Sequence, residues 1–148
     1  MSGKLVARRQ RLVRVRHVQH AQAVAETVRA QNEADNIAHN AQRIARVRDE
    51  LFKNDSNLMG GTFAAYREMA DRLDRAGKQL EGALYDARKV IDYKQEQQVE
   101  ASREKEVAER LREQASARVE AAREARIAAI PPHKLLRMRT MAQSGEKE

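Results

Sequence analysis

Apolar side chains recur at steps of three and four residues through the middle of this 148-residue sequence. The clearest run comprises Phe63, Tyr66, Ala70, Leu73, Gly77, Leu80, Leu84, Ala87 and Ile91. Such spacing is that of a heptad seam, in which each helical turn places one residue against a partner helix. The pattern therefore predicts a long helix that is packed along one side.

A second seam precedes the first. Ala30, Ile37, Ile44 and Leu51 follow one another at intervals of seven residues, with alanines in the alternate row. Further upstream, Val13, Val24 and Val28 depart from this register, so we expect a stutter near residues 18–28.

Two groups of helix-breaking residues divide the chain. Residues 54–61 read Asn-Asp-Ser-Asn-Leu-Met-Gly-Gly, and the prolines at 131 and 132 remove backbone donors. We expect one helix over about 4–53, a turn over 54–61, a second helix over about 62–130 and a basic tail over 131–148. Because a short connection favours antiparallel neighbours, the predicted fold is all-α, a long two-helix antiparallel coiled-coil hairpin that occupies residues 1–148 as a single domain.

Composition supports long helices and excludes several other classes. Ala, Glu, Lys, Leu and Arg supply 79 of the 148 residues, a share typical of coiled coils. The absence of cysteine excludes a disulfide framework and thiolate metal ligands. No uncharged apolar run reaches the roughly 20 residues that span a bilayer, so we expect a soluble protein.

The residue pattern does not predict an enzyme. Two long helices offer no concave pocket that would orient a small-molecule substrate. His17 and His20 share a helix face, but arginines surround them instead of further metal ligands. Gly60 and Gly61 lack the following Lys-Ser or Lys-Thr of a phosphate loop. We therefore expect no catalytic residue, no cofactor and no metal.

Positive charge is concentrated near the N-terminus. Residues 1–30 carry seven bases and one acid, whereas residues 62–130 carry fourteen of each. Clustered arginines can bind phosphates without sequence preference, but no aromatic side chains accompany them to stack on bases. An anionic membrane is a further alternative, although the apolar stripe beside these arginines is interrupted. A protein partner is the preferred interpretation.

The start of the second helix carries the larger side chains of the chain. Phe63, Tyr66, Met69, Leu73, Ala76 and Leu80 cover slightly more than one helix face. Two interpretations remain open here, because these residues either all belong to the seam or include an exposed patch that docks a partner.

In this order of features the chain resembles the FliJ family of flagellar export proteins and their counterparts in type III secretion. The resemblance rests on the basic start from Lys4 to Arg16, the Asn/Asp/Ser/Gly turn, the aromatic-x-x-Tyr opening at Phe63 and Tyr66, and the Gln/Glu/Arg/Ala-rich second helix with its basic tail. It covers nearly the whole length of the chain.

The resemblance implies a non-enzymatic stalk that couples an export ATPase ring to the cytoplasmic domain of a membrane export gate and escorts export chaperones. It also implies a cytoplasmic location, peripheral at the inner-membrane export apparatus through protein contacts. By the family motif, the gate-binding residues would be Phe63, Tyr66, Met69, Leu73 and Ala76, followed by Leu80. By charge alone, the ATPase ring would contact Arg8, Arg9, Arg11 and Arg14. The alternatives are a generic self-associating coiled-coil scaffold and a basic nucleic-acid-associated helical protein.

Overall fold

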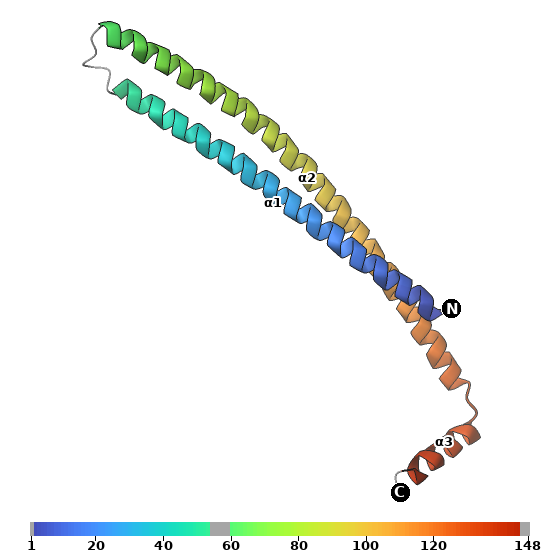
Figure 1. Cartoon of the computed structure of the whole chain (residues 1–148). Coiled ribbons are helices and arrows are strands. Elements are labelled where there is room, and N and C mark those ends of the chain that lie inside the picture. The colour runs from blue at the N-terminus through green and yellow to red at the C-terminus, as the bar shows by residue number, and fades with distance from the viewer. Residues whose placement is uncertain (1, 54–59, 146–148) are drawn as a thin grey trace. The chain divides into compact units, whose positions relative to one another are not determined.

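The computed structural model describes residues 2–53 and 60–145 of the chain, which form three α-helices in these ranges (Figure 1). Helix α1 spans Ser2–Lys53, α2 spans Gly60–Ala128 and α3 spans Pro132–Ser144. No strand occurs in the described ranges, so the predicted all-α class is confirmed. The predicted turn falls largely on residues 54–59, which lie outside the described residues.

The third helix is a difference from the expected two-helix chain with a basic tail. Pro131 stands at the N-cap of α3 with an extended backbone (φ −61°, ψ 145°), and Pro132 is its first residue. Proline ends a preceding helix because it lacks a backbone N–H, yet its fixed φ is already suited to the first turn of a new one. The same two residues therefore end α2 near Ala128 and start α3.

The described residues divide into two compact units. One consists of residues 18–103, and the other of residues 1–17 with 104–148. In each unit a segment of α1 packs against a segment of α2.

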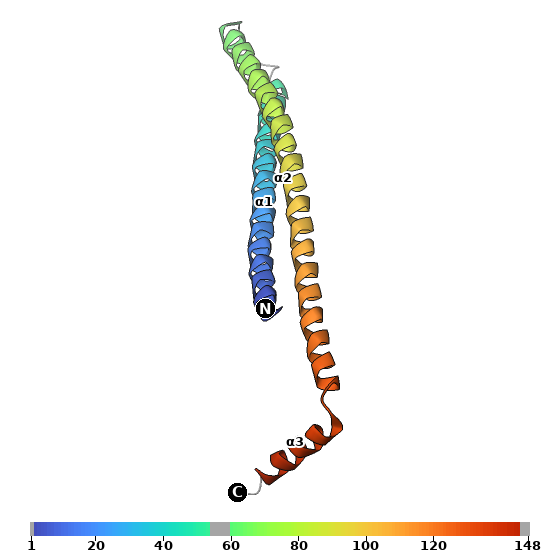
Figure 2. The same cartoon turned by 90° about the vertical axis from the view of Figure 1, so that its right-hand side faces the viewer.

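In the unit of residues 18–103, α1 and α2 lie side by side in both Figure 1 and Figure 2. The cross-helix neighbours are Glu26 with Lys94, Ile44 with Gly77, Arg48 with Asp74, and Phe52 with Tyr66. Positions that ascend along α1 thus meet positions that descend along α2. The two helices of this unit are therefore antiparallel.

The core of this unit is small. Ala30, Ala34 and Ile91 are buried, and Leu84 and Ala87 pack against them from α2. Alanine lets two helices approach closely but removes little apolar area from water, so each contact contributes little to stability.

The unit of residues 1–17 and 104–148 has its own buried residues, Val13, Ala108 and Ala115. Polar contacts flank them, since an Arg16 Nη1 donates to Glu104 Oε2 at 2.6 Å and Arg112 Nη1 donates to Gln10 Oε1 at 3.4 Å. These contacts also pair ascending positions of α1 with descending positions of α2.

Burial along α2 follows the predicted heptad spacing. The buried or half-buried series comprises Tyr66, Ala70, Leu73, Gly77, Leu80, Leu84, Ala87, Ile91, Lys94, Gln98, Ala101, Lys105, Ala108, Arg112 and Ala115. Phe63, which the apolar pattern includes, is instead exposed.

The pattern of buried residues along α1 does not contain the expected stutter. The buried or half-buried series comprises Val13, Arg16, His20, Ala23, Thr27, Ala30, Ala34, Ile37, Ala41 and Ile44. Its steps of three and four continue without interruption through residues 18–28, where the stutter was expected. The prediction was wrong because it followed the valines: Val24 is half-buried beside the seam and Val28 is 53% exposed, whereas His20, Ala23 and Thr27 occupy the seam there.

Candidate partner-binding surfaces

The first turns of α2 carry the residues that the sequence pattern predicts for partner binding. Phe63 and Met69 are about half exposed, at 48% and 54%. The other four residues of that set are half-buried: Tyr66, Leu73, Ala76 and Leu80. The set therefore combines residues turned to solvent with residues that belong to the packed side of the helix.

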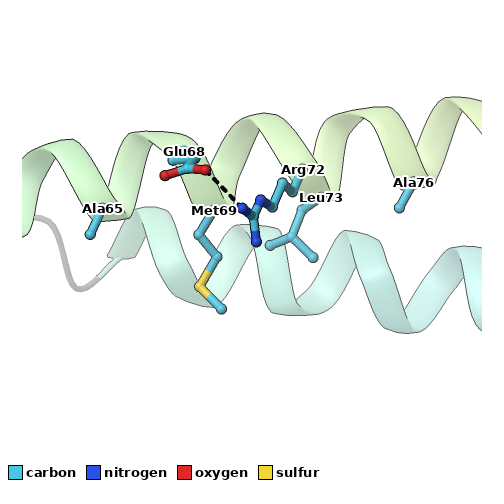
Figure 3. A pocket seen from close by; sticks show the side chains of 6 residues that line it. All are labelled: Ala65, Glu68, Met69, Arg72, Leu73 and Ala76. Atoms are coloured by element: carbon cyan, nitrogen blue, oxygen red, sulfur yellow. Dashed lines mark hydrogen bonds and ion pairs between the residues drawn. The ribbon is translucent and has the colours of Figure 1, made fainter.

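Part of this surface is hollowed. A depression of about 460 Å³ is lined by Ala65, Glu68, Met69, Arg72, Leu73 and Ala76. In Figure 3 the Met69 and Leu73 side chains extend from α2 toward the same side, and an ion pair joins the neighbouring Glu68 and Arg72. The Arg72 Nη2 to Glu68 Oε1 distance is 2.8 Å. The result is an apolar depression with a charged edge.

The sequence predicts half of this lining. It indicates Met69, Leu73 and Ala76 as partner-binding residues, but not Ala65, Glu68 or Arg72. The spacing of Glu68 and Arg72, four residues apart on a helix, was an available signal for an ion pair on this face.

Tyr66 has a packing role. Its ring lies 6.4 Å from the ring of Phe52 on α1, at an angle of 80°, in the edge-to-face geometry that aromatic pairs prefer. The Arg48 guanidinium lies 5.7 Å from the Phe52 ring and pairs with Asp74 at 2.9 Å. The structure thus favours the seam interpretation for Tyr66 and leaves the exposed-patch interpretation for Met69 and its neighbours in the depression.

The four arginines selected by charge lie on the first turns of α1. Arg8, Arg11 and Arg14 are exposed, and Arg9 is half-buried. Within residues 2–53 and 60–145, none of the four forms an ion pair with a carboxylate, in contrast to Arg16 with Glu104. These four guanidinium groups form a cationic surface that an acidic partner would match.

Two histidines, His17 and His20, share a face of α1, and no group of three metal-ligating side chains occurs among the described residues. His17 Nε2 instead lies 2.8 Å from Glu109 Oε1 on α2. This contact ties α1 to α2 in the unit of residues 1–17 and 104–148.

The unit of residues 18–103 contains a cross-helix ion pair between Lys94 and Glu26. Lys94 Nζ donates to Glu26 Oε2 at 2.9 Å. This hydrogen bond, and the charges of Lys94 and Arg29, hold the pKa of the Glu26 carboxyl below its ordinary value of 4.5.

Replacing Lys94 by glutamine is expected to raise the pKa of Glu26 toward 4.5, because the donor charge is lost. A lowered folded-state pKa contributes stability that is present above the unfolded pKa and is lost as pH falls below 4.5 through the folded value. The Lys94→Gln protein should therefore lose less stability over that acid range than the wild type.

An NMR titration of the Glu26 carboxyl carbon checks this result. Lys89→Gln is the matched control, because the Lys89 ammonium lies over the Tyr85 ring at 4.4 Å and away from Glu26. The same titration midpoint for Glu26 in the wild-type and Lys94→Gln proteins would contradict the assignment.

Among the described helices, none combines the length and the apolar character needed to cross a membrane. In comparisons with protein-family models, curated proteins and solved structures, nothing matched this chain. The residues of the chain offer an apolar depression on α2 and a cationic surface on α1, and both are suited to binding a partner.

Proposed function

We propose that this chain is a non-enzymatic stalk of a flagellar or type III protein export apparatus. In this proposal α1 and α2 act as one antiparallel coiled-coil hairpin at the cytoplasmic side of the inner membrane. The start of α2 binds the export gate, the basic start of α1 binds the export ATPase ring, and the polar part of α2 receives export chaperones.

The observation that carries the proposal is the apolar depression at Met69, Leu73 and Ala76, at the start of a helix that contacts α1 through Tyr66 and Gly77. An apolar side chain of a partner that filled this depression would be removed from water, which would contribute to binding. The lengths of the helices suit a spacer, since 52 and 69 residues correspond to about 78 and 104 Å. The four arginines of α1 provide a second, chemically different surface.

The test measures binding to the cytoplasmic domain of the export gate encoded by the same genome. Met69→Asp places a charge in the depression at an exposed position, so it should weaken gate binding at least ten-fold while helicity is unchanged. Leu73→Asp should weaken it further. Val99→Asp is the matched control, because Val99 is also an exposed apolar residue of α2 but lies outside the depression.

Two results would count against the export role. One is a wild-type chain that binds neither the gate domain nor the ATPase and only self-associates in sedimentation, as the scaffold alternative requires. The other is undiminished gate binding by Met69→Asp and Leu73→Asp. In a second arm, joint replacement of Arg8, Arg11 and Arg14 by glutamine should reduce binding to the ATPase and leave gate binding intact.

A further inference from the structure

Helix α3 has no buried residue, although it carries four large apolar side chains. Leu135, Leu136, Met138 and Met141 are 43%, 64%, 61% and 76% exposed. An isolated helix of 13 residues is marginal in water, and this one makes no packing contact that buries any of its residues. It is therefore a candidate for stabilisation by a binding surface.

The apolar residues of α3 are arranged around the helix in a particular way. At about 100° per residue, Leu135, Met138, Met141 and Ala142 fall within a sector of about 120°. Thr140 lies on the opposite side of the helix, and Leu136 lies outside the sector. The helix thus presents one sector that contains three large apolar side chains and one alanine, with Lys134 inside it in the first turn.

Positive charge surrounds this sector. Viewed down the helix axis, Arg137 lies about 40° beyond Met141 at one edge of the sector. Arg139 lies about 40° beyond Leu135 at the other edge. Lys134 lies within the sector in the first turn, where its long side chain can carry the ammonium away from an apolar phase. No acidic residue occurs from Ile127 to Ser144. A surface that covers the apolar sector must therefore carry negative charge next to both edges of that sector.

We propose that α3 is an interfacial helix that lies on an anionic lipid bilayer, with its apolar sector in the acyl boundary and its cations at the lipid headgroups. A bilayer supplies anionic groups along both edges of the helix, whatever its rotation or position. A protein groove would instead need acidic residues on two rims in a fixed register, and nucleic acid would not cover the apolar sector. This inference is independent of the export function, which connects the chain to the membrane through protein contacts alone.

The first experiment is flotation of the full chain with vesicles. Binding is expected to phosphatidylcholine vesicles that contain phosphatidylglycerol, to weaken with salt, and to be much weaker with phosphatidylcholine alone. Joint replacement of Arg137 and Arg139 by glutamine should reduce binding about 30-fold, since each cation near an anionic surface contributes roughly five-fold. Joint replacement of Met138 and Met141 by serine should reduce it at least ten-fold.

A control separates α3 from basic residues elsewhere in the chain. Arg43→Gln with Arg46→Gln removes the same charge from exposed positions of α1 and should leave vesicle binding within about two-fold, because neither residue belongs to α3 or to the basic start of α1. Since α3 buries no residue, none of the α3 variants should change the thermal midpoint of α1 and α2. Glycerol phosphate at matched ionic strength should not compete with the vesicles.

A fluorescent reporter tests the orientation of the helix. The chain contains no tryptophan, so Ala142→Trp places a single indole in the apolar sector, and Thr140→Trp places one on the opposite side. Anionic vesicles should shift the emission of Ala142→Trp to the blue and leave that of Thr140→Trp nearly unchanged. Equal shifts, equal binding to both kinds of vesicle, or binding to polyglutamate without binding to vesicles would each overturn the proposal.

Discussion

Replacing Ala34 by aspartate is expected to destabilise the helix pair of residues 18–103 by about 3 kcal/mol, because the new carboxylate would be buried without a partner. Ala34 is only 4% exposed and lies in the cluster with Ala30 and Ile91. For a chain of this size, that loss corresponds to a decrease of about 6–12 °C in the thermal midpoint, measured by far-UV circular dichroism.

Ala45→Asp is the matched control for this substitution. Ala45 lies on the same helix and in the same unit but is exposed, so the change should cost only about 0.5 kcal/mol of helix propensity. Similar decreases in midpoint for the two variants would show that position 34 is not packed against α2.

The regular part of the fold could be predicted from the sequence because apolar residues mark it. From Tyr66 to Ile91 the seam residues are apolar or glycine, and burial follows them position by position. The spacing of apolar residues is sufficient to predict this part of the seam, because a helix that buries one side must repeat its apolar residues at steps of three and four.

The seam of α1 near residues 18–28 could not be predicted in this way, because polar side chains occupy it. Thr27 is half-buried, and its Oγ1 donates to the carbonyl oxygens of Ala23 at 2.9 Å and of Lys94 at 3.3 Å. Arg16 is half-buried beside Glu104. Polar residues are tolerated in such positions when they find hydrogen-bond partners on the facing helix, and those partners are about 70 to 90 residues away in the sequence.

The candidate site was predicted only in part for a related reason. Apolar pattern identifies which residues share a helix face, but not which of them the facing helix covers. Tyr66 and Met69 share the start of α2, yet Tyr66 meets the Phe52 ring while Met69 remains 54% exposed. The separation of seam from exposed surface depends on the facing residues of α1, and so on tertiary structure.

Helix α3 was not predicted because the local signal at its start, a pair of prolines, is compatible with both the end of one helix and the start of another. The prolines at 131 and 132 predict the end of the second helix, but proline at the first position of a helix also favours the start of a new one. The apolar and basic residues that follow contain no further breaker until Gly145, where α3 has ended.

Replacing Ala108 by aspartate is expected to separate the first turns of α1 from α2. Ala108 is 2% exposed and, with Val13 and Ala115, forms the buried residues of the unit of residues 1–17 and 104–148. An unpartnered charge there should cost about 3 kcal/mol. Since an isolated helix end frays in water, amide protection in residues 2–17 should decrease by about 100-fold in hydrogen exchange.

Amide protection in residues 30–45, which belong to the unit of residues 18–103, provides the reference for the Ala108→Asp variant. Protection in residues 30–45 should remain within about three-fold of the wild type, because Ala108 belongs to a separate set of packed residues. Ala117→Asp, at an exposed position of α2 in the same unit, should leave both segments protected. An equal loss of protection in residues 2–17 and 30–45 would mean that the helices open as one cooperative structure, and local packing at Ala108 would then not determine the stability of the basic start of α1.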